Sequence, residues 1–253
     1  MLLEEVKNKK EFRGLSDVFV ARVIALRQQK YNVYVEKEKK LLIKEARAVL
    51  REVYGAYLLP GYWRKEKYLQ KMETWNDTVL CSKILSLHLS SKERLPYYQK
   101  LYQKLQEKIR YKTVLDLGCG LNVFSLPWMG KVAYYGVDVN KDDVEFCNTY
   151  LQKFGLVGGI RWGDLLDFDT FVKTDVCFLL KVLEGVETVK RGSTEKVLKK
   201  ITSPYIVASF ATQTLSGSKR ISPRRLTWFE ALVPGAEKFV LGPEVYYLIE
   251  NNL

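Results

Sequence analysis

Three acidic residues lie where the chain passes from a short apolar run into a loop. Asp116 falls in the run VLDLGCG, Asp138 ends YGVD, and Asp164 ends IRWGD. If these runs are neighbouring parallel strands, their carboxyl ends meet at one edge of a sheet, where open α/β sheets bind ligands. Asp138 could accept hydrogen bonds from both hydroxyls of an adenosine ribose, and Asp164 could accept from the adenine amino group while Leu165 donates its backbone N–H. Each acid taken alone could equally be an ordinary loop or cap residue.

Two glycines follow the first of these acids. Gly118 and Gly120 would let the backbone of the turn approach a ligand closely. A nicotinamide-binding turn would normally have a third glycine where Val123 stands, whereas the form Asp-x-Gly-x-Gly is associated with S-adenosylmethionine. The alternative is a tight strand-to-helix turn that binds no ligand. Together with the acids, the turn favours an S-adenosylmethionine site.

Short apolar runs and helical stretches alternate after Lys112. We expect strands at Thr113–Leu117, Ala133–Val137, Gly159–Trp162, Asp175–Leu180, Tyr205–Phe210, Lys238–Leu241 and Val245–Glu250, with helices at Asp142–Phe154 and Glu187–Lys200. Such alternation is typical of right-handed crossovers and a mainly parallel sheet. Gly242-Pro243 joins the last two runs without a helix, which indicates a hairpin. The pattern predicts the α/β fold of a Rossmann-like class I methyltransferase with a seven-stranded, mostly parallel sheet.

The preceding part of the chain has a helical pattern from Glu4 to Arg110. Apolar residues recur there at three- and four-residue steps, and Gly14 and Leu59-Pro60-Gly61 are among the few breaks. Ser90-Ser91-Lys92-Glu93 has the form of a capping box that would open the last of these helices. We therefore expect an all-helical N-terminal region at residues 1–110 and a methyltransferase domain at residues 111–253.

The net charge of +12 is confined to the N-terminal part. Residues 1–112 contain 25 Lys and Arg against 13 Asp and Glu, a difference of 25 − 13 = +12, whereas residues 113–253 contain 16 of each. A basic surface gains affinity for a polyphosphate by releasing condensed counterions. Nucleic acid is thus the expected partner of a basic, RNA-binding helical region. The alternative is a set of solvated Lys/Glu helices, as in Glu36-Lys37-Glu38-Lys39-Lys40.

Several other classes of protein do not match the composition. The sequence has no apolar run of about eighteen residues that would cross a membrane, and its charged beginning is unlike a signal peptide. The four cysteines form no Cys-x-x-Cys pair and His88 is the one histidine, so we expect neither a metal site nor disulfides. These features predict a cytoplasmic protein without a membrane partner.

One segment, His88-Leu89-Ser90-Ser91-Lys92-Glu93-Arg94-Leu95-Pro96, identifies a resemblance. The chain resembles, from about Gly14 to its C-terminus, the ribosomal RNA methyltransferases of aminoglycoside resistance, which modify the N7 of a guanine in the decoding site of the small subunit. The other matching pieces are Tyr54-Gly55-Ala56-Tyr57-Leu58, Asp116–Asn122 with Pro127-Trp128-Met129-Gly130, Leu179-Leu180-Lys181, Arg191-Gly192-Ser193, Ser209-Phe210 with Thr212, and Glu244–Ile249.

The resemblance implies S-adenosylmethionine as cofactor and a set of residues that bind it. Arg94 would hold the methionine carboxylate, a task suited to the bidentate guanidinium. The other implied contacts are Tyr57, His88, Leu89, Ser90, Gly118, Asp138, Asp164, Leu165 and Leu180. The implied substrate is small-subunit ribosomal RNA within the assembled small ribosomal subunit, and we expect the enzyme to be a monomer.

Methylation at guanine N7 needs no general base, because N7 carries an unprotonated lone pair. The enzyme mainly has to align this atom with the methyl donor, and we expect the stacked base to be extruded from its helix for this purpose. Lys181, after the fourth strand, and the loop Phe210–Arg225 are the candidates to position it. Lys181 could equally be a surface lysine.

The chain also departs from the family pattern near this loop. Ala211 stands where family members have Pro, Ser218-Lys219-Arg220 lacks the Lys-Gly-Met ending, and Val189 replaces a Gln found in some members. These departures leave open a methyltransferase of the same fold that acts on a transfer RNA or on a different ribosomal nucleotide. A non-catalytic RNA-binding factor would explain the basic helices but not the three acids, and a small-molecule N-methyltransferase would explain the acids but not the segregated charge.

Overall fold

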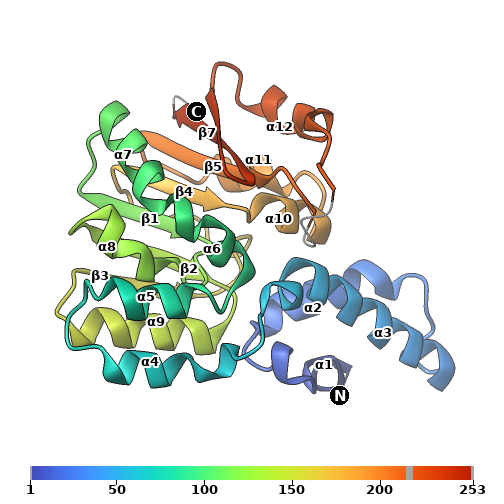
Figure 1. The fold of residues 1–253 in the computed structure, drawn as a ribbon. Helices are drawn as coiled ribbons and strands as arrows, with labels where there is room; N and C mark the ends of the chain where they lie inside the picture. Colours follow the sequence, from blue (N-terminus) through green and yellow to red (C-terminus); the bar gives the residue numbers. More distant parts are fainter. Residues whose placement is uncertain (1, 215–218, 252–253) are drawn as a thin grey trace.

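The computed structural model describes residues 2–214 and 219–251, and its centre is one seven-stranded sheet (Figure 1). The strand order is β3-β2-β1-β4-β5-β7-β6, in which β7 runs antiparallel to both of its neighbours and all other pairs are parallel. The strands are β1 (Thr113–Leu117), β2 (Ala133–Asp138), β3 (Gly158–Trp162), β4 (Val176–Leu180), β5 (Tyr205–Ala211), β6 (Glu237–Leu241) and β7 (Glu244–Glu250). The predicted fold is confirmed, including the C-terminal hairpin.

Both faces of the sheet are buried because successive side chains of each strand point to opposite sides. Val114, Phe178 and Val207 belong to one apolar core, and their neighbours Leu115 and Cys177 belong to a second core on the other face. The first core is covered by α8 (Leu126–Met129) and α9 (Lys141–Lys153), together with the helices between residues 65 and 108. The second is covered by α10 (Leu183–Val189), α11 (Ser193–Leu198) and α12 (Thr227–Leu232).

The prediction of a single helix at Glu187–Lys200 is wrong, because α10 ends at Val189 and α11 starts at Ser193. Gly192 lies between them with φ of +76°, a left-handed conformation that glycine adopts without a steric penalty. The Glu187 carboxylate accepts hydrogen bonds from the backbone N–H groups of Gly192 and Thr194, both at 2.7 Å. A side chain of the first helix thus stabilises the start of the second.

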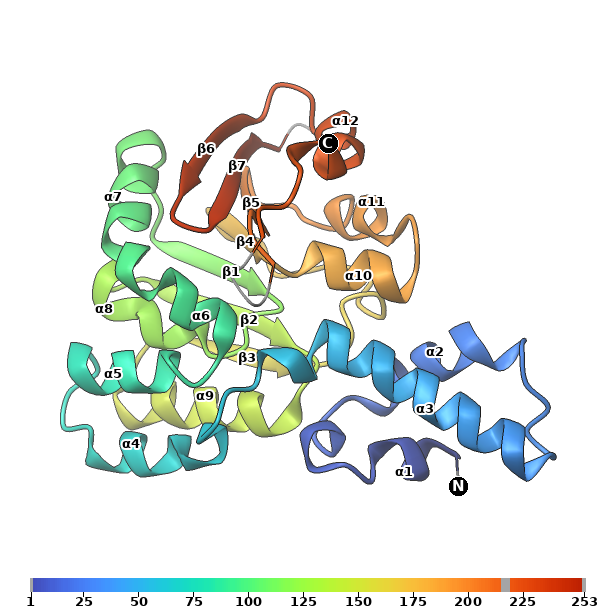
Figure 2. The same ribbon diagram turned by 45° about the vertical axis from the view of Figure 1, so that its right-hand side comes forward.

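The region before the sheet is helical, as predicted, but its helices pack in two groups (Figure 2). The first group has its own apolar core and consists of α1 (Leu2–Lys7), α2 (Asp17–Gln28) and α3 (Glu36–Val53). The second group shares the core of the sheet and consists of α4 (Lys65–Lys71), α5 (Thr78–Leu85), α6 (Leu89–Arg94) and α7 (Tyr98–Lys108). Residues of the second group are therefore placed by the sheet itself.

The capping box expected at Ser90–Glu93 is also wrong. Helix α6 begins at Leu89, one residue before Ser90, and its cap position is His88, whose side chain makes no capping hydrogen bond. Ser90 is buried within the first turn, and Glu93 forms an ion pair with Lys181 instead of folding back on the helix start. Glu93 therefore forms a tertiary ion pair with Lys181 and not the local hydrogen bond of a capping box.

The first helical group contacts the sheet unit at the carboxyl edge. The backbone N–H of Ser16 donates to the carbonyl of Val139, which follows β2, at 2.9 Å. Arg22 of α2 pairs with Asp164 and Asp167, both in the loop after β3. The end of α3 packs against α10. Within the described residues, we find no helix with the length and apolar character needed to cross a membrane.

Candidate functional site

A cavity of about 420 Å³ lies at the carboxyl ends of the strands, within the range of volumes that hold small-molecule ligands. We call it the central cavity. Its lining comes from the first helical group, from α6, from the loops after β1, β2, β3 and β4, and from Arg225 near the C-terminus. The predicted site residues Tyr57, His88, Ser90, Arg94, Gly118, Asp138, Asp164, Leu165, Leu180 and Lys181 all line it. Leu89, also implied by the resemblance, is not among the lining residues that the structure describes.

The turn after β1 needs glycine for two reasons. Gly118 has φ of +73°, and a Cβ atom built on it would lie 2.4 Å from Cγ2 of Val182, in the loop after β4. The backbone N–H of Gly118 donates to the carbonyl of Val137 at 2.8 Å, which holds the turn against β2. At Gly118 the central cavity is therefore lined by backbone atoms without a side chain.

Asp138, at the end of β2, is buried and fixed by its own hydrogen bonds. Its two carboxylate oxygens accept from the backbone N–H groups of Gly120 at 2.8 Å and Asn140 at 2.9 Å. Burial, and then the charge of Asp143, raises the pKa of Asp138 to about 6 despite these bonds. Each carboxylate oxygen has a second lone pair for a ligand in the cavity, such as a pair of hydroxyls.

Asp138→Ala should weaken the binding of S-adenosylhomocysteine. Two ribose hydroxyls would lose a charged acceptor, and hydrogen bonds to charged groups contribute about 1.5–3 kcal/mol. Isothermal titration calorimetry should show a loss of affinity of roughly ten- to a hundredfold. Unchanged affinity would exclude Asp138 from the cofactor site.

The pKa of Asp138 also predicts a pH dependence of cofactor affinity in the unmodified protein. Protonation removes a charged acceptor, so affinity should fall as the pH is lowered through about 6. Burial lowers the pKa of His88 to about 4, so the histidine does not titrate in the same window. Asp138→Asn is the matched control, since its affinity should be low and independent of pH there.

Three buried polar atoms of residues that line the central cavity lack a partner among the described residues. One is Nε of Arg225, and the other two are Oδ1 of Asp116 and Nδ1 of His88. The other Asp116 oxygen, Oδ2, accepts from Nδ2 of Asn122 at 2.7 Å and from the hydroxyl of Tyr134 at 2.6 Å. A buried polar atom without a partner costs free energy, so the atoms of Asp116 and His88 point to a polar ligand. The amino-acid part of S-adenosylmethionine, with its ammonium and carboxylate groups, fits this requirement.

Asp164 also lines the central cavity and is held by Arg22. Its Oδ2 accepts from Nε of Arg22 at 2.9 Å, and its Oδ1 accepts from the backbone N–H of Leu166 at 3.0 Å. A carboxylate has about four acceptor positions, so the Arg22 contact leaves capacity for an adenine amino group. The side chain that orients Asp164 thus comes from the basic N-terminal part of the chain.

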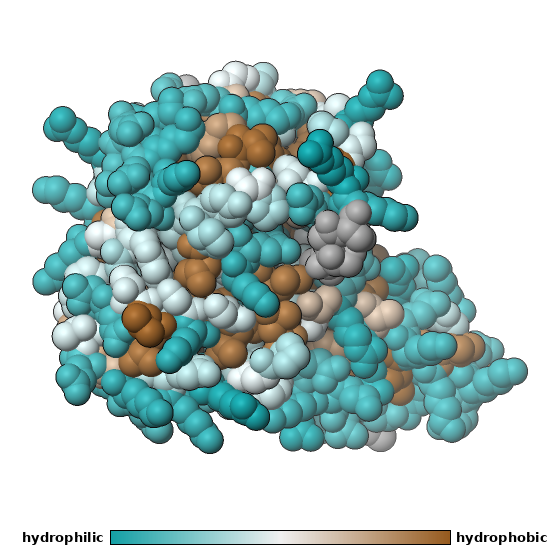
Figure 3. Space-filling view, viewed as in Figure 1, coloured by the Kyte–Doolittle hydropathy of each residue, from teal (hydrophilic) through white to brown (hydrophobic). Residues whose placement is uncertain are grey.

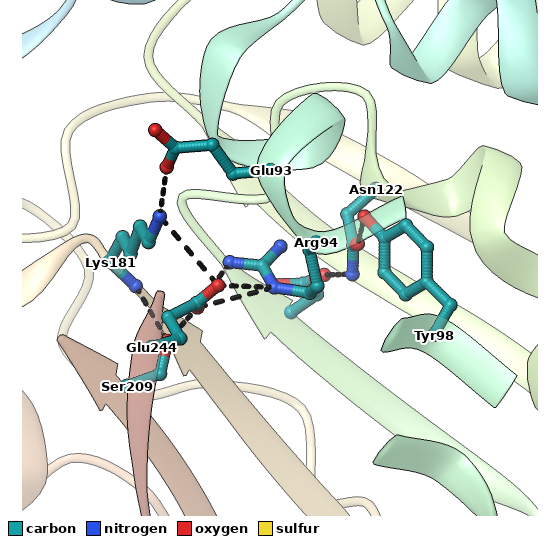
Figure 4. A network of polar contacts seen from close by, with 8 residues as sticks. Glu93, Arg94, Tyr98, Asn122, Lys181, Ser209 and Glu244 are labelled. Atoms are coloured by element: carbon teal, nitrogen blue, oxygen red, sulfur yellow. Dashed lines mark hydrogen bonds and ion pairs between the residues drawn. The ribbon is translucent and has the colours of Figure 1, made fainter. Parts of the chain in front are cut away.

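Arg94 and Lys181 meet on one carboxylate, that of Glu244 at the start of β7 (Figure 4). Nε and Nη2 of Arg94 form three hydrogen bonds with the Glu244 carboxylate, the shortest at 2.7 Å. Nζ of Lys181 lies 2.6 Å from Glu93 and 3.7 Å from Glu244. Burial opposes the ionisation of Glu244, but the charges of Arg94 and Lys181 lower its pKa overall. These contacts hold all three side chains in place.

Lys181 is held in an unusual backbone conformation. Its φ is +58°, the one positive value among the described residues other than glycine. Its backbone N–H donates to the carbonyl of Ser209 at 3.1 Å, so β5 fixes the conformation. Strained residues of this kind gather at functional sites, where the surrounding structure over-determines them. The side chain of Lys181 is 5% exposed and lines the central cavity, so it is not a surface lysine.

The structure adds residues that the sequence alone did not indicate. Phe19, Asn122, Glu184 and Arg225 also line the central cavity. Asn122 stands two residues after Gly120, at the end of the matching segment Asp116–Asn122, and could have been found from that position. Phe19 is far from every motif in the sequence, whereas Arg225 is the last residue of the loop Phe210–Arg225 that the sequence analysis singled out. Residues 215–218, in the loop Phe210–Arg225 that we expect to border the target base, lie outside the described residues.

Comparison with known proteins gives a consistent result. The family model described as "Ribosomal RNA methyltransferase (FmrO)" matches residues 11–233. A 16S rRNA (guanine(1405)-N(7))-methyltransferase of Micromonospora echinospora is 32% identical, over 83% of this chain and 82% of the relative. The protein with the same name from Proteus mirabilis is 30% identical, over 98% of this chain and 97% of the relative.

Solved structures agree with these relatives. The 16S rRNA methyltransferase RmtF in complex with S-adenosyl-L-homocysteine superimposes with a TM-score of 0.85 at 27% identity, covering 99% of this chain and 97% of the other. The 16S rRNA methylase RmtB superimposes with a TM-score of 0.80 at 25% identity and the same coverage. The likeness thus includes the N-terminal helices as well as the sheet.

Proposed function

Because this chain belongs to the FmrO family of ribosomal RNA methyltransferases, we propose that it transfers a methyl group from S-adenosylmethionine to guanine N7 in the decoding-site helix of small-subunit ribosomal RNA. The observation that supports this most directly is the central cavity, where a glycine turn and acids at the carboxyl ends of three successive strands lie together. The relatives are named for guanine N7 methylation of 16S rRNA, and they align with 83% and 98% of this chain. S-adenosylmethionine supplies an electrophilic methyl group when it is bound.

We assign the binding of the cofactor to residues along the central cavity. Asp138 receives the ribose hydroxyls, and Asp164 with the backbone of Leu165 receives the adenine. Arg94 faces the methionine carboxylate, while Asp116 and His88 offer their unpartnered atoms to the same end of the molecule. Tyr57, Ser90, Gly118 and Leu180 complete the lining. The chain orients the donor by fixing both of its ends.

The protein contributes alignment to the reaction, because N7 is already a nucleophile and loses no proton when it is methylated. Alignment of reacting groups can supply several kcal/mol, about 7–11 in well-oriented model reactions. Lys181 borders the target base in this proposal, and its strained backbone and its bond to Glu93 hold it there. The methylated guanine carries a positive charge and loses a hydrogen-bond acceptor, so a cationic aminoglycoside would bind it less well.

The basic N-terminal region is the proposed contact with RNA, with residues 1–110 as the helical region and 111–253 as the methyltransferase domain. Figure 3 shows that the part of the surface over α1, α2 and α3 is mainly hydrophilic. Lys40, Lys44, Arg47 and Arg51 line a shallow groove between α1 and α3. A broad basic surface recognises folded shape and phosphate positions more than base sequence, which favours the assembled small subunit as substrate. We propose that the enzyme acts there as a cytoplasmic monomer.

Lys40→Glu/Lys44→Glu should weaken binding to the small subunit and flatten its salt dependence. Each lost phosphate contact removes about one unit from the slope of log affinity against log salt. Filter binding at several salt concentrations measures this slope, and affinity for S-adenosylhomocysteine should not change. The matched control is Lys131→Glu/Lys173→Glu, at exposed positions near the amino ends of the strands. Equal slopes for the two variants would contradict an RNA-binding role for the groove.

The product of the reaction tests the proposed function directly. Small ribosomal subunits incubated with the protein and methyl-labelled S-adenosylmethionine should acquire one 7-methylguanine in the decoding-site helix. Borohydride and aniline cleave RNA at this base, and primer extension locates the break. Assembled subunits should be better substrates than naked 16S rRNA. Label without cleavage, or cleavage elsewhere, would indicate the alternative nucleotide; no label in any RNA would contradict the proposal.

A further inference from the structure

An ion pair lies on the wall of the central cavity that the cofactor assignment leaves unused. Glu184 belongs to α10, and Arg225 belongs to the short 3₁₀ helix Pro223–Leu226 that precedes α12. Nη2 of Arg225 lies 2.6 Å from Oε1 of Glu184, and the two side chains are 34% and 36% exposed. Both residues line the cavity and remain accessible from it.

The pair lies near the part of the site where the target base is expected. Burial raises the pKa of Glu184, and the charges of Arg225 and Lys181 oppose this rise. Burial, followed by the charges of Glu184 and Glu93, raises the pKa of Tyr57 to about 12. Glu184, Lys181 and Tyr57 all line the central cavity, so this carboxylate shares the cavity with the lysine that we propose borders the target base.

The contacts of the pair leave groups available for a ligand. Arg225 uses Nη2 for both of its recorded contacts, with Glu184 and with the carbonyl of Ala211 at 3.2 Å. Its Nε is buried and has no hydrogen-bond partner in the described part of the chain. The other acids near Lys181 are engaged, since Glu93 pairs with Lys181 and Glu244 pairs with Arg94. The ion pair with Arg225 uses Oε1 of Glu184, and the second oxygen of this carboxylate can accept from a ligand.

We propose that Glu184, positioned by Arg225, binds the Watson–Crick edge of the extruded target guanine and so selects guanine. This inference rests on the proposed function and concerns the same site. When N7 of a guanine points toward the methyl donor, its N1–H and N2–H groups point away from the donor. A carboxylate there accepts from both donors in a bidentate arrangement. Adenine would present the N1 lone pair to the same carboxylate, which repels it.

The same carboxylate also favours the transfer itself. A bond forms between N7 and the methyl carbon while the bond from that carbon to sulfur breaks, so positive charge moves from sulfur to the guanine ring. A fixed negative charge on Glu184 stabilises the ring as this charge develops. Glu184 therefore contributes both to the choice of base and to the rate, whereas Arg225 acts through Glu184.

The test compares Glu184→Gln with the unmodified protein on small subunits that carry either guanosine or adenosine at the methylated position. Gln is similar in size to Glu but uncharged, and its amide can donate to adenine N1. Single-turnover rates on guanosine should fall on the order of 10- to 100-fold, and the guanosine-to-adenosine rate ratio should fall as well. Affinities for S-adenosylhomocysteine and for the subunit should be unchanged. Glu195→Gln, on the exposed face of α11, is the matched control.

Three results would overturn the inference. The first is an unchanged rate and an unchanged base ratio in Glu184→Gln. The second is a slower rate with an unchanged ratio that Glu184→Asp, which keeps the charge, does not partly restore. The third is a slower rate explained by weaker cofactor binding, which would assign Glu184 a structural role. If the unmodified protein methylates no RNA, the proposed function itself fails, and that failure is seen before any variant is compared.

Discussion

Asp143→Ala is expected to lower the free energy of unfolding by about 3–5 kcal/mol, because it leaves a buried lysine without its counter-charge. The ammonium of Lys65 pairs with Oδ1 of Asp143, and both side chains are at most 2% exposed. Oδ2 of the same carboxylate accepts from the hydroxyls of Tyr54 at 3.0 Å and Tyr62 at 2.5 Å. One carboxylate of α9 thus joins the end of the first helical group to the sheet unit.

Urea denaturation followed by circular dichroism measures this effect. Asp142→Ala is the matched control, since Asp142 is the exposed neighbour in the first turn of α9 and contributes about 0.3–1 kcal/mol through the helix dipole. Adding Lys65→Met to Asp143→Ala should recover part of the lost stability, because the uncompensated charge is then removed. Similar losses for Asp142→Ala and Asp143→Ala would show that the buried pair does not stabilise the fold.

Arg94→Ala should have a double effect, on stability and on cofactor binding. Its removal leaves Glu244 buried without its principal partner, at a cost of about 3–5 kcal/mol of unfolding free energy. In our assignment it also removes the contact with the methionine carboxylate. Calorimetry with two ligands separates these effects, because 5′-methylthioadenosine lacks the amino-acid part of the cofactor. Affinity for S-adenosylhomocysteine should fall by at least tenfold while affinity for methylthioadenosine changes little.

Glu244→Gln is the matched variant for Arg94→Ala. It breaks the same ion pair and should destabilise the fold to a similar extent, but it leaves the guanidinium in the central cavity. Its affinity for S-adenosylhomocysteine should therefore exceed that of Arg94→Ala. If both variants lose affinity for the two ligands in parallel, Arg94 serves the fold through Glu244 and does not contact the methionine carboxylate.

Local patterns in the sequence were sufficient for most of the fold. All seven strands lie where the apolar runs predict them, because each run is short and is bounded by charged or glycine-rich segments. The hairpin at Gly242-Pro243 and the helix over 142–154 follow from the same local signals. The helix expected at Glu187–Lys200 is interrupted locally, at Gly192, whereas the capping box failed because a distant partner overrode a local motif. Glu93, predicted to cap its own helix, pairs instead with Lys181, which is 88 residues away in the sequence.

The sequence by itself determined the family, the sheet and the place of the cofactor turn. These depend on glycines, acids and apolar periods within a few residues of one another. Only the tertiary structure decided which charges meet. Arg94 and Glu244 are 150 residues apart, Arg22 and Asp164 are 142 apart, and Glu184 and Arg225 come from different helices. The sequence does not show which opposite charge a side chain will pair with, because the electrostatic interaction between two charges depends on their distance and burial in the folded protein. The sequence therefore predicts which strand ends form the site, whereas the tertiary structure determines which ion pairs form there.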